Sequence, residues 1–127
     1  MKQFSLIAFF SILGVSLRWL IVTLVPFQLG MVSGILIVNV IGSFLIGVLI
    51  QLTSSSEIIS GDMKVALIVG FLGSFTTYSS FAAEIFRFLN ERMILSGILY
   101  FINHSLVTIT SLFIGYYLSA FFFSRFF

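Results

Sequence analysis

Four long stretches of this chain contain no charged residue, and they decide which folds are possible. Residues 3–17, 19–56, 65–83 and 93–124 provide runs of 15, 38, 19 and 32 uncharged residues. A helix that crosses the roughly 30 Å hydrocarbon core of a bilayer needs about 20 apolar residues. The second run is too long for one crossing, and Pro26–Gly30 is its natural break. The pattern predicts four membrane-spanning helices, at about 4–25, 32–53, 64–90 and 94–122.

The composition excludes most other classes of protein. Hydrophobic residues make up 60% of the chain and charged residues 8%, which no soluble domain of this size could accommodate. A net charge of +2 is no footprint of nucleic-acid binding, and a chain with no Cys and one His has no thiolate or His-cluster metal site. The polar run Thr53–Glu57, with Ser60 and Gly61 beyond it, predicts a loop. The first span lacks an Ala-x-Ala-like cleavage site and is expected to be retained. We therefore expect residues 1–127 to form a single all-α integral membrane domain.

The basic residues divide almost evenly between the two sides of the predicted bundle. One side carries Lys2, Lys64 and Arg125, and the other carries Arg87, Arg92 and, if it lies near the far end of its span, Arg18. Because an excess of Lys and Arg on one side normally fixes orientation, this chain is expected to insert both ways round and to form an antiparallel dimer. The alternative is that a few charges still fix one orientation.

Polar residues within the spans gather on single helix faces. Asn39 shares a face of the second span with Gly42, Ser43 and Gly47, and small residues there favour close helix packing. Packing does not explain Asn39, whose amide needs a partner. The fourth span aligns His104, Thr108, Ser111 and Gly115, where the His is either a hydrogen-bonded packing group or faces water. Near the span ends, Arg18 can extend to the interface, and Glu84 can pair with Arg87.

The third span contains an unusual segment, Gly70–Phe81. It combines two glycines with five Ser and Thr hydroxyls besides Tyr78, and these are poor residues for a helix interior. An unwound break is tolerated inside a membrane where protein or a wet cavity surrounds it, whereas Ser and Thr can also bond back to helix carbonyls. The composition leaves a break and an intact helix equally open.

The absence of acidic residues from the middle of the spans bears on the kind of ion that could pass. A proton relay or a cation pore would use carboxylates there. Amides, hydroxyls and the positive edges of aromatic rings instead suit a small anion, because they replace its hydration without trapping it beside a full charge. The residues alone therefore indicate a dimeric, anion-permeable, four-span protein.

Three motifs closely resemble those of the fluoride channel family called Fluc or CrcB. Gly14–Trp19 is similar to the family's Gly-x-x-x-Arg-aromatic pattern, and Asn39–Gly47 to its Asn-x-x-Gly-Ser-Phe-x-x-Gly helix. The segment from Gly70 through Glu84 resembles the signature of its third helix. The resemblance implies an antiparallel, dual-topology homodimer in the cell membrane, with two pores along the subunit interfaces that passively export fluoride from the cytoplasm. It also implies a third helix broken at mid-membrane. A structural, untransported sodium ion would be held there by the main-chain carbonyls of Gly73 and Thr76.

The same resemblance implies which residues line the fluoride path. The matching positions are Asn39, Tyr78, Ser79, Ser80, Phe81, His104 and Thr108, with Arg18 and Glu84 in vestibule or structural roles. Tyr78 departs from the family's usual Phe, which leaves open whether this chain pairs with itself or with a divergent paralogue.

Two other functions deserve comparison. A small multidrug antiporter is also short, four-span and dual-topology, but it needs a Glu in its first helix, and the first span here has no acid. A noncatalytic assembly subunit would use the small-residue faces for packing alone. An enzyme is least compatible with the sequence, because no nucleophile–base set or metal cluster is visible.

Overall fold

The computed structural model describes residues 1–28, 30–55 and 59–126, and within these ranges every regular element is a helix. Four segments are long and apolar enough to cross a membrane: 2–24, 34–54, 61–90 and 94–125. They confirm the predicted all-α architecture of four spans. The elements are α1 (Lys2–Leu24), α2 (Gly34–Ser55), α3 (Gly61–Val65), the π-helix η1 (Ala66–Leu72), α4 (Gly73–Phe75), α5 (Tyr78–Asn90) and α6 (Ile94–Phe126).

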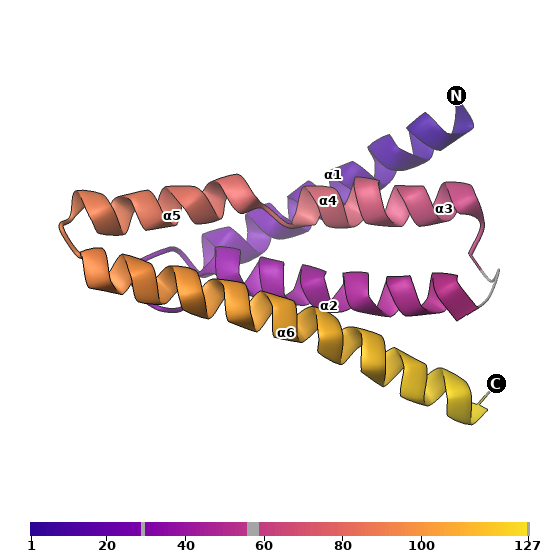
Figure 1. Cartoon of the computed structure of the whole chain (residues 1–127). Coiled ribbons are helices and arrows are strands. Elements are labelled where there is room, and N and C mark those ends of the chain that lie inside the picture. The colour runs from indigo at the N-terminus through magenta and orange to yellow at the C-terminus, as the bar shows by residue number, and fades with distance from the viewer. Residues whose placement is uncertain (29, 56–58, 127) are drawn as a thin grey trace.

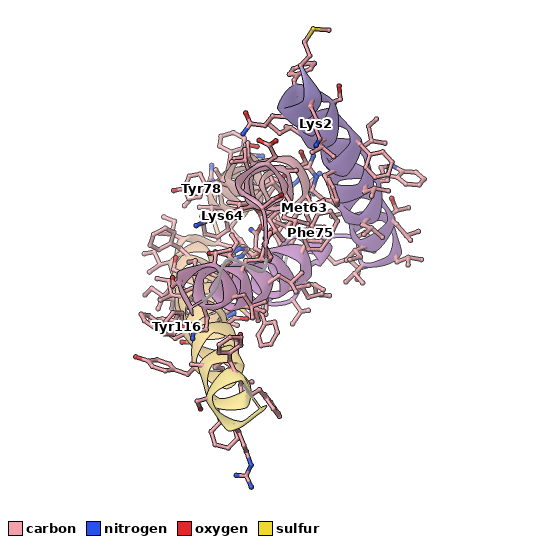
Figure 2. All side chains as sticks on the ribbon, turned by 90° about the vertical axis from the view of Figure 1, so that its right-hand side faces the viewer. Lys2, Met63, Lys64, Phe75, Tyr78 and Tyr116 are labelled. Carbon is pink, nitrogen blue, oxygen red and sulfur yellow. The ribbon has the colours of Figure 1, made fainter. Side chains whose placement is uncertain are left out.

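The helices run back and forth along one axis (Figure 1). Both chain termini lie at one end of the bundle, with the start of α3, and the turn between α5 and α6 lies at the other end. α1 crosses the third span at an angle. Viewed along the bundle in Figure 2, Tyr78 lies on the side away from α1. An even number of spans thus brings Lys2 and Lys64 to the same end.

Contacts through small residues bring α2 against α6. A Cβ built on Gly47 would overlap the carbonyl of Leu112, and one built on Gly115 would overlap the carbonyl of Phe44. The Ser111 hydroxyl also donates to the main-chain carbonyl of Val40 at 2.9 Å. The polar faces of the second and fourth spans therefore face each other, as small-residue packing predicts.

The third span is assembled from several short pieces. The Ser60 hydroxyl accepts from the Met63 N–H at 3.4 Å and starts α3, which passes directly into η1. The helix stops after Phe75, where Thr76 has ψ 159° and Thr77 has φ −154° and ψ 122°. The structure therefore breaks this span close to its middle, which agrees with the broken third helix that the family resemblance implies.

α1 packs on the first half of this span through glycine. A Cβ on Gly14 would overlap the carbonyl of Phe71, and one on Gly70 would come within 2.8 Å of the carbonyl of Ile7. Main chain thus lies against main chain, and α1 reaches the break. Beyond the break, a small apolar core holds α5 against the start of α2 and α6; its buried members are Ile35, Phe81, Phe88 and Tyr100.

The predicted loop after the second span is shorter than expected. α2 continues through Thr53 and Ser54, whose hydroxyls donate back to the carbonyls of Leu49 at 2.8 Å and Ile50 at 2.7 Å. This back-bonding lets polar residues remain helical. Gly61, also expected in the loop, opens α3. Residues 56 and 57 of the predicted loop, and Leu29 of the predicted break before α2, lie outside the described residues.

Candidate functional site

The side-chain amide of Asn39 forms hydrogen bonds with the main chain at the break. Its Oδ1 accepts from the Thr77 N–H at 2.9 Å, and its Nδ2 donates to the Thr77 carbonyl at 3.1 Å. The two main-chain partners fix which way round the amide lies, because one must donate and the other must accept. Nδ2 also lies 3.0 Å from His104 Nε2, so it donates to that nitrogen. The predicted need of Asn39 for a partner is met by the unwound segment and by α6.

The hydrogen bonds at the break leave two main-chain carbonyls without the N–H donors that a continuous helix would give them. In an uninterrupted α-helix the Thr77 N–H would donate to the carbonyl of Gly73, and the Ser80 N–H to that of Thr76. Here the first goes to Asn39, and the second goes to the Thr77 hydroxyl at 3.3 Å as the N-cap of α5. The released carbonyls belong to the two residues that the family resemblance assigns to sodium. Main-chain oxygen is a suitable ligand for a hard cation, so this donor set fits such an ion.

Arg18 lies beside the break. Its Nη1 donates to the Thr76 carbonyl at 3.4 Å, and the side chain is half-buried. The reason is the close approach of α1, since the glycine contacts place Arg18 within reach of a carbonyl that has lost its helical donor.

A groove of about 300 Å³ opens beside the break, between α2, α5 and α6. Five of the seven predicted path residues line it: Asn39, Tyr78, Phe81, His104 and Thr108. The Tyr78 and Phe81 rings meet edge-on, with centroids 5.6 Å apart, and Phe81 lies against the His104 ring at 4.0 Å. The Thr108 hydroxyl donates to the carbonyl of His104 at 2.8 Å. Tyr78 is 74% exposed, so one wall of the groove is open.

The predicted hydroxyl pair lies outside this groove. Ser79 Oγ lies 3.2 Å from the Thr77 hydroxyl, which also donates to Ser80 Oγ at 3.2 Å. Ser80 lines a second cavity of about 360 Å³, together with Glu84 and Arg87. The pair therefore stands at the start of α5, with Ser80 at the second cavity.

Glu84 is 5% exposed and belongs to a buried polar cluster. Its Oε2 accepts from the Tyr100 hydroxyl and, at 3.1 Å, from the Ser33 hydroxyl. The Arg87 guanidinium lies over the Phe27 ring, 5.9 Å from its centroid, and lines the same cavity as Glu84. Glu84 lines the second cavity and is held by Ser33, just before α2, and by Tyr100 of α6.

Sequence reasoning missed Thr77, Ser33 and Tyr100. Thr77 lies within the segment Gly70–Phe81, but its role depends on the break and on Asn39. Ser33 has a local signal, since its hydroxyl accepts from the Leu36 N–H at 3.1 Å at the start of α2. Its partners Glu84 and Tyr100 are 51 and 67 residues away along the chain, so no spacing rule identifies them. In the part of the chain described here, no three His, Cys, Asp or Glu side chains gather as a metal site.

The chain is similar to a family of known proteins. Residues 5–116 match the family model described as CrcB-like protein, Camphor Resistance (CrcB). The chain is 37% identical over 103 residues to the fluoride-specific ion channel FluC of Chlorobium phaeobacteroides, covering 80% of each chain. It is 38% identical over 99 residues to the protein of that name from Methanococcus vannielii, covering 77% of this chain and 80% of the relative. The FluC of Haemophilus influenzae is 42% identical over 94 residues, which are 72% of this chain and 59% of the relative.

Proposed function

Since this chain belongs to the CrcB family, we infer that it is a fluoride-specific ion channel and not an enzyme. It is a multi-pass membrane protein with four spans. The observation that supports this function best is the groove beside the break. Its polar groups are amide, hydroxyl, imidazole and main chain, and its aromatic rings meet edge-on.

We propose that fluoride passes along this groove. The side chains of Asn39, His104 and Thr108 and the ring edges of Tyr78 and Phe81 would replace its hydration one group at a time. Among the described residues, no Lys or Arg side chain lines the groove itself, so a small anion there touches no cationic side chain that would hold it. Ser79 and Ser80 would act at the end of the groove, where the path meets the second cavity.

A second copy of the chain would close the open wall of the groove. Tyr78, which lines the groove, and Gly73, which lies just before the break, are both exposed. The nearly even division of Lys and Arg between the two ends favours insertion in both orientations. We therefore propose an antiparallel homodimer with two pores at the subunit interfaces, surrounded by lipid. Tyr78 carries a hydroxyl that the family's usual Phe lacks. Pairing of this chain with a divergent paralogue is therefore the alternative outcome.

The carbonyls of Gly73 and Thr76 are the groups proposed to hold a sodium ion. Two oxygens from one chain leave a hard cation under-coordinated, so the two breaks of a dimer would share it. The ion, when bound, supplies a fixed positive charge that joins the breaks and is not transported. Arg18 can satisfy the Thr76 carbonyl in a single chain.

Export follows from the chemistry of fluoride. Hydrogen fluoride is a weak acid that crosses lipid as a neutral molecule and releases fluoride inside the cell. A passive anion path in the cell membrane lets the membrane potential, negative inside, drive that fluoride out. The channel would thereby limit fluoride toxicity without consuming metabolic energy.

Fluoride release from liposomes that contain only this protein tests the proposal. Vesicles loaded with potassium fluoride should release fluoride to an external electrode when a potassium ionophore carries the counter-charge, and vesicles loaded with potassium chloride should release chloride far more slowly. Absence of fluoride release would be the result expected for a packing subunit or for a required paralogue. Release that requires an imposed proton gradient would instead indicate a coupled transporter.

A further inference from the structure

Asn39 has no amide hydrogen free in the resting structure. One Nδ2 hydrogen goes to the Thr77 carbonyl at 3.1 Å, and the other goes to His104 Nε2 at 3.0 Å. The Asn39 Oδ1 accepts from the Thr77 N–H at 2.9 Å, so the amide cannot turn over without placing donors against donors. An anion that uses this amide must therefore take a hydrogen from one of its present partners.

The bond to His104 is the one that can be given up. Both bonds to Thr77 satisfy main-chain groups at a break within a span, where unpaired backbone is costly. The bond to His104 satisfies only a neutral side-chain nitrogen. Asn39 and His104 both line the groove, so an anion in it can reach the shared hydrogen.

His104 is held rigidly in the role of acceptor. Its ring is 3% exposed, lies against the Phe81 ring at 4.0 Å between centroids, and meets the Tyr100 ring edge-on at 5.6 Å. Because Nε2 accepts a hydrogen bond, the ring is neutral and its one proton is on Nδ1. That nitrogen is buried, with no hydrogen-bond partner in the structure. The ring is thus fixed by packing, and Nε2 points at the amide.

We propose that His104 sets anion selectivity by competing with the passing ion for the Asn39 amide hydrogen. This inference rests on the proposed fluoride channel function and names His104 as the residue that decides which anion can bind the amide. A charged acceptor forms a shorter and stronger bond to N–H than a neutral one does. Fluoride, the smallest halide, approaches the hydrogen most closely and displaces the imidazole nitrogen. Chloride is larger, so its electric field at the hydrogen is weaker. Its bond to the Asn39 amide would therefore be too weak to displace the imidazole nitrogen of His104.

The single His of the chain makes a direct test possible in the unaltered protein. Nitrogen NMR of protein carrying ¹⁵N-labelled histidine should show Nδ1 protonated and Nε2 as a hydrogen-bonded acceptor. Adding sodium fluoride should shift the Nε2 signal towards that of a nitrogen without a donor, and sodium chloride at equal concentration should leave it in place. A proton on Nε2 at rest, or equal responses to the two salts, would overturn the proposal.

Two variants test the same idea by transport. His104→Leu removes the acceptor, so the fluoride-to-chloride permeability ratio in liposomes should fall about tenfold, the value of one neutral hydrogen bond. His104→Gln keeps an acceptor oxygen and should retain a ratio within about threefold of the wild type. An unchanged ratio in His104→Leu overturns the competition while leaving the channel function intact. Wild-type vesicles that release no fluoride would overturn the channel itself, and if the Leu variant fails to fold, the NMR measurement decides.

Discussion

The side-chain amide of Asn39 pairs with the main chain of Thr77 through two hydrogen bonds, at 2.9 and 3.1 Å. The residues are 38 positions apart, yet this pair occupies the amide and carbonyl that a continuing helix would need. The pair lies at the break in the third span, and both residues line the groove. Asn39 is therefore both a wall of the proposed pathway and a hydrogen-bonding partner of the unwound main chain.

Replacing Asn39 with Asp should slow fluoride release from liposomes by at least about tenfold, a barrier increase of about 1.4 kcal/mol. The carboxylate places a negative charge in the groove and removes both Nδ2 donors, so the ion is repelled and the Thr77 carbonyl loses a partner. Asn90→Asp, the same change at an exposed position at the end of α5, is the control. Release at wild-type speed from Asn39→Asp vesicles would remove Asn39 from the pathway.

Replacing Gly73 with Val should alter the dependence of fluoride release on sodium. A Cβ at Gly73 meets only the carbonyl of Ile68, at 3.5 Å, so a single chain has room for it. The added bulk instead lies beside the carbonyls that we propose to bind sodium. Thr76→Ser keeps the hydroxyl that donates to the Leu72 carbonyl and should have the smaller effect, because only main-chain oxygens act as ligands.

The measurement is the rate of release as sodium is replaced by a bulky organic cation at constant ionic strength. A Gly73→Val protein with the sodium dependence of the wild type would contradict the assignment of these carbonyls.

Replacing Tyr100 with Phe should destabilise the protein by about 1–3 kcal/mol, because it leaves the buried Glu84 carboxylate without one of its two donors. Denaturant or thermal unfolding in detergent micelles measures this loss. Tyr117→Phe removes the same hydroxyl from a side chain that is 65% exposed and should change stability little. Equal losses in the two variants would show that the cluster around Glu84 contributes no net stability.

Replacing Gly14 with Ala should destabilise the packing of α1 on the third span by about 1–3 kcal/mol, the usual effect of overpacking. The new methyl group would overlap the carbonyl of Phe71, which cannot move away as a side chain could. Gly61→Ala has open space around its Cβ and serves as the control. The same unfolding assay applies, and a Gly14→Ala protein as stable as the control would mean that α1 can shift at no cost.

Sequence patterns predicted the four spans and the side of the groove that α6 forms. Charge-free runs fix the number of spans because the cost of placing charge in a bilayer leaves few alternatives. Face periodicity brought His104 and Thr108 together on the side of α6 that faces α2, since helix geometry is regular over such distances. The contact between the polar faces of α2 and α6 therefore follows from local rules.

The hydrogen-bond partners of residues far apart in the sequence could not be predicted from such patterns. Composition allowed both a break and an intact helix at Gly70–Phe81, and what decides the matter is a bond from Asn39 on another span. The glycine contacts of α1 place Arg18 beside the Thr76 carbonyl. Glu84 has Arg87 as a neighbour along α5, but its hydrogen bonds to Ser33 and Tyr100 come from residues that only the assembled fold brings near.

The π-helical segment Ala66–Leu72 has a consequence for the angular position of everything that follows it. A π turn holds an additional residue relative to an α turn, and one residue rotates a helix face by about 100°. The widened turns absorb that additional residue, so deleting one residue from this segment would restore a regular α-helix and leave Gly73 and Thr76 facing close to their present direction. A one-residue deletion is therefore expected to disturb the break less here than in a regular α-helix, where it would rotate everything that follows by about 100°.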